Sequence, residues 1–211
     1  GPFPAVILLQ DFGPSDRNEQ IGPNLPFYDL AEQLSKQGIA VLRYDKRTYT
    51  YANEMLGADE MTVYDEIIDD AVSAYTQLSA ITQIDPQRIY LLGHGFGGTV
   101  MPLVADKLPE TAGCILFAAP ARSISDTLYE QVAYILSLDE TATEENKADI
   151  LEEAQRTAQN IQELTPESTL SPDNLLGTPA SYWLSLRDYQ PLQAIQTVQK
   201  PLLFLYGGRD F

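Results

Sequence analysis

Short apolar runs alternate along the chain with longer stretches in which apolar residues recur at helical spacing. The apolar runs are predicted to be strands: Ala5 to Leu9, Ala40 to Tyr44, Arg88 to Leu92, Cys114 to Ala118 and Pro201 to Tyr206. Most of them are apolar throughout and do not alternate, which is typical of strands covered on both faces of a parallel sheet. The pattern therefore predicts an α/β fold with a mainly parallel sheet and flanking helices.

Three helices are predicted between the first four strands. Phe27 to Gln37 carries an apolar face and stops at Gly38, a residue well suited to end a helix. Met61 to Ile81 has apolar residues at helical spacing, and its acidic residues are expected to point outward. Phe96 to Leu108 follows a glycine-rich turn and is predicted to be the third helix.

The connection between the fourth and fifth strands, residues 119–200, is far longer than the dozen or so residues that a parallel crossover needs. We therefore predict a core over 1–120, a helical cap inserted over 121–198, and a return to the core over 199–211. The acidic middle of the cap, residues 139–167, is expected to be a solvated helix lying over the sheet edge. An acidic partner-binding surface is the alternative.

Composition narrows the possible partners. The 211 residues include 13 Lys plus Arg and 30 Asp plus Glu, a net charge of −17 that repels nucleic acids and anionic membranes. No apolar run reaches the roughly 18 residues that a membrane span needs.

Cys114, the only cysteine, lies in a predicted strand and is expected to be a core residue. Because no metal-ligand spacing occurs, the sequence predicts no metal site and no cofactor, and it does not indicate the oligomeric state.

The two ends of the chain favour its interpretation as a segment of a longer protein. It opens without methionine, enters a strand almost at once, and stops at Phe211 just after another strand. We expect a soluble protein in which further N- and C-terminal elements of the fold, and any signal peptide, lie outside this segment. The sequence does not indicate the compartment.

A sharp turn is predicted after the third strand. Residues Ile89 to Gly98 read Ile-Tyr-Leu-Leu-Gly-His-Gly-Phe-Gly-Gly and lead directly into a helix. A side chain that stands alone above such a turn needs very small neighbours two residues away, because strand and helix backbones pass in contact. Gly93 and Gly97 meet this need. A phosphate-binding loop is disfavoured, since no Gly-Lys-Ser/Thr follows and the chain is strongly acidic.

This turn resembles the Gly-His-Ser-x-Gly-Gly nucleophile elbow of α/β-hydrolases, with Gly95 in place of the serine. Other segments resemble a bacterial esterase-like branch of that superfamily, related to dienelactone hydrolases: Gly13 to Arg17, Ile21 to Asn24, Gly38 to Arg47, Ala119 to Arg122, and Pro201 to Asp210. The resemblance covers nearly the whole chain. It implies an α/β-hydrolase fold and descent from a serine hydrolase that cleaves small carboxylic esters through an acyl-enzyme.

The resemblance also implies roles for single residues. Gly95 stands at the nucleophile position and Asp210 at the position of the triad acid, while the catalytic histidine of the family would follow beyond Phe211. The backbone N–H groups of Phe12 and Phe96 correspond to the oxyanion-hole donors.

Three residues depart from the family pattern or cannot fill its roles. Gln10-Asp11 replaces the His-Gly that ends the first strand in these enzymes, and a carboxylate there is expected to oppose the negative charge of a transition state. His94 is expected to be structural, because the residue before the nucleophile faces the sheet side of the turn.

Other clusters leave two interpretations open. Tyr182 and Trp183 belong to an aromatic and apolar cluster that either packs in the core or lines a pocket for an acyl or aromatic substrate. Asp45, Lys46 and Arg47 form either a salt-bridged corner or a substrate clamp.

The sequence thus predicts a protein that resembles serine carboxylic-ester hydrolases but is catalytically inactive as given, and whose partner is a small-molecule ester or acyl ligand. Glycine at position 95 removes a backbone strain of about 1–3 kcal/mol together with the nucleophile. Natural loss and deliberate substitution would both leave this pattern. The alternatives are a non-catalytic ligand- or protein-binding member of the same fold, and a scaffold that uses the acidic insertion.

Overall fold

A single parallel sheet organises the computed structural model, which describes residues 1–55 and 60–208. The described strands lie in the order β2-β1-β3-β4-β5, and all their pairings are parallel. They are β1 (Phe3–Leu9), β2 (Ala40–Leu42), β3 (Ile84–His94), β4 (Gly113–Phe117) and β5 (Leu202–Leu205). Each predicted strand is present, so the predicted fold class is confirmed.

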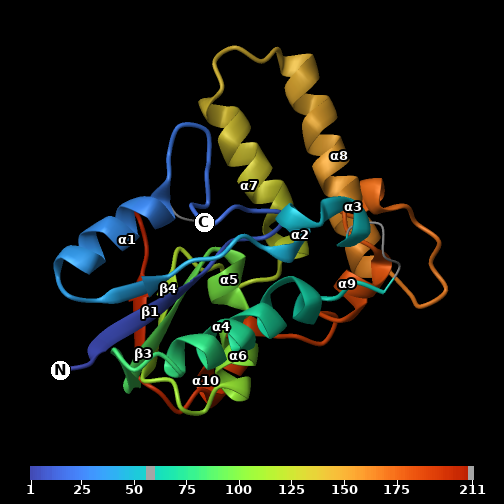
Figure 1. Ribbon diagram of the computed structural model, residues 1–211. Helices are drawn as coiled ribbons and strands as arrows, with labels where there is room; N and C mark the ends of the chain where they lie inside the picture. The colour runs from blue at the N-terminus through green and yellow to red at the C-terminus, as the bar shows by residue number, and fades with distance from the viewer. Residues whose placement is uncertain (56–59, 209–211) are drawn as a thin grey trace.

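Both faces of the sheet are covered at β1, as its continuous apolar run predicts, whereas Leu203, Phe204 and Leu205 of the equally apolar β5 are 50%, 47% and 43% exposed. Val6 and Leu8 of β1 belong to a buried cluster with Phe27 of α1 (Pro26–Lys36). The alternate residues of the same strand join a larger cluster with α4 (Asp69–Ser79) and α6 (Met101–Lys107). Figure 1 shows α1 on one side of the sheet and α4 and α6 on the other. A strand with no polar side is therefore the direct consequence of two apolar layers.

Two predicted helices are interrupted. Met61 to Ile81 begins as η1, a π-helical turn over Tyr64–Ile68, and continues as α4. The expectation that its acidic residues point outward is wrong for Glu66, which is 1% exposed and forms an ion pair with a buried lysine. Phe96 to Leu108 divides into α5 (Phe96–Thr99) and α6, with Pro102 in the first turn of α6.

Short helices absent from the prediction follow β2, namely α2 (Arg47–Thr50) and α3 (Ala52–Met55). Their first residue, Arg47, forms an ion pair with Asp70 of α4, with Nε 2.9 Å from Oδ1. Ion pairs between elements leave no mark in the spacing of apolar residues, and the apolar pattern therefore does not predict these two short helices.

Helices fill the connection between β4 and β5. They are α7 (Ile124–Leu138), α8 (Glu144–Glu163), the 3-10 turn η2 (Pro172–Asn174), α9 (Ala180–Leu184) and α10 (Pro191–Thr197). Ser123 and Thr143 cap α7 and α8 through their side chains. The two helices pack together as a hairpin that stands clear of the sheet in Figure 1, so the expectation of an acidic helix over the sheet edge is wrong in its placement. The division at 121–198 remains a prediction.

In the two described ranges, no helix combines the length and the apolar character that crossing a bilayer requires.

Candidate functional site

The candidate site lies where the chain changes direction across the sheet. From β1 the chain moves outward to β2 and then returns to β3 on the other side of β1. In open parallel sheets, the loops that leave adjacent strands at such a point diverge and form a ligand-binding crevice. The segment that carries Asp11 follows β1, and the turn centred on Gly95 follows β3.

The turn after β3 has an unusual backbone. Gly95 has φ 51° and ψ −123°, a conformation that side-chain-bearing residues adopt at a cost. A Cβ atom added at Gly93 would lie closer than 3.0 Å to the backbone of Gly97, and one added at Gly97 would approach the carbonyl of Gln10 equally closely. The strand, the turn and the helix therefore pack backbone against backbone, as the glycine spacing predicts.

The carboxylate of Asp11 sits directly in front of this turn. Its Oδ1 accepts hydrogen bonds from the backbone N–H of Phe12 at 2.8 Å and from that of Phe96 at 2.6 Å. A Cβ atom at position 95 would lie closer than 3.0 Å to the Asp11 carboxylate group. The two N–H groups that the family resemblance assigns to an oxyanion hole thus converge on one oxygen of the protein's own side chain.

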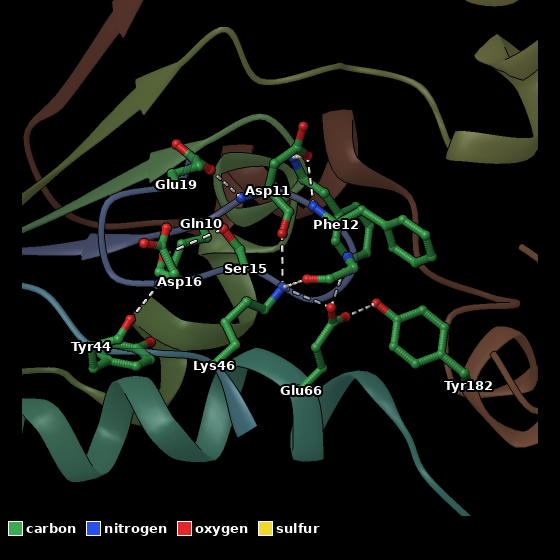
Figure 2. A network of polar contacts seen from close by, with 12 residues as sticks. Gln10, Asp11, Phe12, Ser15, Asp16, Glu19, Tyr44, Lys46, Glu66 and Tyr182 are labelled. Atoms are coloured by element: carbon green, nitrogen blue, oxygen red, sulfur yellow. Dashed lines mark hydrogen bonds and ion pairs between the residues drawn. The ribbon is translucent and has the colours of Figure 1, made fainter. Parts of the chain in front are cut away.

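A buried lysine holds the segment that carries Asp11. Lys46 Nζ donates to the backbone carbonyls of Asp11 at 2.7 Å and Gly13 at 2.8 Å, and to Glu66 Oε1 at 2.7 Å (Figure 2). The side chains of Lys46 and Glu66 are 1% and 2% exposed. Three acceptors satisfy the ammonium group, which allows this charge to remain buried.

Glu66 completes the network from the other side. Its Oε1 also accepts the Gly13 N–H at 2.9 Å, and its Oε2 accepts a short hydrogen bond from the Tyr182 hydroxyl. Burial, followed by the charge of Glu66, raises the pKa of Tyr182 well above its usual value, so this hydroxyl keeps its proton and acts as a donor. Tyr182 belongs to α9, and the network therefore connects α9 to the loop after β1 (Figure 2).

His94 lies next to the turn, with its side chain 19% exposed. Its Nδ1 lies 2.8 Å from Oε2 of Glu19, and its ring is flanked by Phe27 and Phe117. Glu19 is itself 3% exposed, and its Oε1 accepts the backbone N–H of Asp11 at 2.6 Å. Glu19 thus links His94 to the Asp11 segment. His94 also borders a cavity together with Asp11 and Gly95, so its purely structural role remains a prediction.

Two neighbouring cavities meet at Phe96. One, of about 500 Å³, is bordered by Asp11, Phe12, Gly95 and other residues. The other, of about 460 Å³, is bordered by apolar side chains of the cap and by polar residues, among them Ile161, Trp183, Leu186, Arg122, Arg187 and Asp126. Both volumes fall within the usual range of small-molecule sites.

The two aromatic residues singled out in the sequence have different surroundings. Tyr182 is fully buried and bound to Glu66, whereas Trp183, 6% exposed, also borders the cavity of about 460 Å³. The indole N–H of Trp183 donates to the carbonyl of Leu175 at 3.0 Å. The Phe12 ring contacts both of them, which places the candidate donor loop against α9.

The corner after β2 is salt-bridged, as one of the two interpretations predicts. Asp45 Oδ2 lies 2.6 Å from an Arg17 nitrogen, Lys46 pairs with Glu66, and Arg47 pairs with Asp70. Hydrogen bonds from the Arg17 side chain lower the pKa of Asp45.

Cys114 lies in β4, 2% exposed, where burial raises the pKa of its thiol to about 11. It is a core residue, as expected. Asp210, the candidate triad acid, lies outside the described residues, and its position remains a prediction from the sequence.

The parallel sheet, the glycine turn after β3 and the converging donors define an α/β-hydrolase fold of the esterase-like branch. The chain matches the serine aminopeptidase S33 family over residues 26–211 and belongs to that family. Esterase EstD of Thermotoga maritima is 36% identical over all 211 residues, and the chain spans 47% of the length of that protein.

Solved structures share the same architecture. An esterase from Pyrococcus furiosus superposes with a TM-score of 0.54 at 17% identity, over 97% of this chain and 60% of that one. The α/β-hydrolase GrgF from Penicillium sp. sh18 gives a TM-score of 0.52 at 17% identity, over 98% and 82% of the two chains. At these identities the likeness establishes the fold.

Proposed function

We propose that this chain is an esterase-like α/β-hydrolase domain that does not itself hydrolyse esters. The observation that carries the proposal is the Asp11 carboxylate, which accepts the N–H groups of Phe12 and Phe96 and stands where the side chain of residue 95 would begin. Gly95 supplies no hydroxyl for attack on a carbonyl carbon.

Ester hydrolysis through an acyl-enzyme needs a nucleophile and free donors for the developing oxyanion. An ester carbonyl that entered this cleft would have to displace an attached carboxylate from both donors. Loss of one such donor costs on the order of 3 kcal/mol of transition-state stabilisation, and a neighbouring anion adds repulsion. The missing hydroxyl at position 95 and the Asp11 carboxylate on the two donors therefore each act against catalysis, independently of one another.

A second candidate function is non-catalytic binding of a small acyl ligand. It is favoured by the cavity of about 460 Å³, whose lining combines apolar side chains with Arg122, Arg187 and Asp126. A medium-chain carboxylic acid or ester has an apolar body and a polar end that would match these walls. This candidate needs no nucleophile.

The test is a burst assay with p-nitrophenyl acetate on the longest form of the protein that its gene encodes. We expect no acyl-enzyme burst from the unchanged protein, and little or none from Gly95→Ser, because the Asp11 carboxylate would have to swing away from the new side chain and release both donors. The double variant Asp11→Gly/Gly95→Ser is the one in which a burst should appear if the remaining machinery is intact. A burst from the unchanged protein would refute the proposal.

Calorimetry with octanoate separates the two candidates. Saturable binding to the unchanged protein, together with no burst in any variant, would favour the non-catalytic binding function. A burst in the double variant would instead favour an enzymatic lineage whose activity has been removed at two positions.

A further inference from the structure

We infer that the N–H groups of Phe12 and Phe96 form a carboxylate-binding site, and that Asp11 is its intramolecular ligand. An oxyanion hole binds a negatively charged oxygen only while a reaction proceeds. Here the same two donors hold a carboxylate in the resting protein. The ligand class it takes is therefore a small carboxylate. The inference concerns binding alone and does not depend on the catalytic state of the protein.

The geometry is that of a bound anion. Both N–H groups point at the same oxygen, Oδ1, with nitrogen–oxygen distances of 2.8 and 2.6 Å. Such short contacts are typical of charge-assisted hydrogen bonds from main-chain donors to a carboxylate. One donor comes from the loop after β1 and the other from the turn after β3, so the two loops are joined through the Asp11 side chain.

The loop that carries the Phe12 donor is held by contacts other than the Asp11 carboxylate. The carbonyl of Asp11 is anchored to Lys46, both polar backbone groups of Gly13 are bound by Lys46 and Glu66, and the N–H of Asp11 is bound by Glu19. None of these contacts uses the Asp11 carboxylate. Removal of that group should therefore leave two converging N–H groups facing the cavity of about 500 Å³.

Attachment explains why an internal ligand occupies the site. A tethered group acts at an effective concentration of at least millimolar, whereas a free carboxylate must first approach a chain of net charge −17.

Two cations near Asp11 are already paired with acids of the fold. Lys46 pairs with Glu66. Arg122, which borders the same cavity, pairs with Glu130. Removal of Asp11 takes one negative charge out of this cavity, which favours entry of a small anion relative to the unchanged protein.

The experiment follows the amide resonances of Phe12 and Phe96 by proton–nitrogen NMR while sodium acetate is added, with sodium chloride at equal ionic strength as the reference. In the unchanged protein we expect both amide protons to be shifted downfield and to respond little to acetate. In Asp11→Ala we expect them to move upfield and to return downfield saturably as acetate is added. The response of the unchanged protein should be at least about tenfold smaller, because the tethered group competes.

Asp139→Ala is the matched control. Asp139 Oδ1 also accepts two backbone N–H groups, from Thr141 at 2.7 Å and Ala142 at 3.2 Å, at the end of α7. Its removal should shift those amides, and acetate should not restore them, because the contact forms a turn and does not line the cavity.

Three results would overturn the inference. One is an equal acetate response in the unchanged protein and in Asp11→Ala, and another is a folded Asp11→Ala that gives no saturable response. If Asp11→Ala does not fold, Asp11→Gly, the family-like residue, takes its place. The third result needs no variant: Phe12 and Phe96 amide protons at ordinary positions in the unchanged protein.

Discussion

Two carboxylates bind main-chain N–H groups of the same short loop, yet they have opposite environments. Glu66 is 1% exposed and shares its oxygens among Lys46, Tyr182 and the Gly13 N–H. Asp11 is exposed and receives its hydrogen bonds from the N–H groups of Phe12 and Phe96. The difference in burial, more than the hydrogen bonds to main-chain N–H groups, decides whether each carboxylate is needed for the stability of the fold.

A buried charge cannot lose its partner without leaving an uncompensated ion, whereas an exposed one exchanges its contacts for water. Glu66 is therefore part of the fold, and Asp11 is an occupant of the cleft that can be removed. Substitutions on the two sides of the loop should separate these roles.

The largest effect is expected for Glu66→Ala. It leaves the Lys46 ammonium buried with only two carbonyl acceptors, and such changes cost about 3–5 kcal/mol of unfolding free energy. Urea unfolding measures the loss. Asp11→Ala is the matched control and should cost clearly less. Equal losses for the two variants would contradict the distinction drawn between them.

Replacement of both Lys46 and Glu66 tests whether the unpaired charge causes the loss of stability in Glu66→Ala. Lys46→Met/Glu66→Met removes both charges and keeps most of the side-chain volume, but it leaves the Asp11 and Gly13 carbonyls and the Tyr182 hydroxyl without these partners. It should therefore destabilise the protein, but less than Glu66→Ala, which leaves a buried charge unpaired. A double variant at least as unstable as the single one would show that the pair contributes more than mutual compensation.

Gly95→Ala is expected to have the next largest effect. Position 95 has φ 51°, and a residue with a side chain in this conformation loses about 1–3 kcal/mol of unfolding free energy through backbone strain. A Cβ atom there would also meet the Asp11 carboxylate, which adds a steric cost. Thermal or urea unfolding measures it. In Asp11→Gly/Gly95→Ala the steric part should disappear while the backbone part remains. Strict additivity of the two changes would mean that Asp11 does not occupy this space.

Tyr182→Phe should have a smaller effect. It removes the hydroxyl donor of Glu66 Oε2 inside the core, and a lost hydrogen bond to a charged group costs about 1.5–3 kcal/mol. Tyr189→Phe is the control, since the Tyr189 hydroxyl donates to the neutral carbonyl of Thr99 at 2.7 Å. The Tyr189 variant should therefore lose less stability in urea unfolding, and the reverse order would contradict the importance of the Glu66 charge.

The smallest effect is expected at the exposed pair of Asp45 and Arg17. Hydrogen bonds from Arg17 lower the pKa of Asp45 in the folded state, so the pair stabilises the protein above the unfolded pKa of Asp. That contribution is lost as the pH falls through the folded pKa. Asp45→Asn should thus cost at most about 1 kcal/mol at pH 7, with the difference vanishing near pH 2. Unfolding measured across this range would refute the expectation if the difference grew on acidification.

The sheet could be predicted from the sequence because burial on both faces leaves a direct mark. A strand between two apolar layers is apolar at every position, as in Ala5 to Leu9, and no distant residue needs to be known. Gly93 and Gly97 were equally predictable, since the steric need for small residues acts within one turn.

The polar network could not be predicted in the same way. An acid within a helical pattern indicates an outward position unless its partner is known, and the partners of Glu66 lie 20 and 116 residues away. The sequence placed the Asp11 carboxylate near the candidate donors. Its direction depends on the path of the loop, which Lys46 and Glu19 fix.

The hydroxyl of Tyr182 has a practical consequence for anyone who exchanges the helices between β4 and β5 for those of a relative. Because α9 delivers this donor to Glu66, a transplanted segment must bring an equivalent hydroxyl to the same place. In a chimaera without that hydroxyl, the buried Glu66 carboxylate would lose one hydrogen-bond donor. A failure of such a chimaera to fold would then come from this one missing contact.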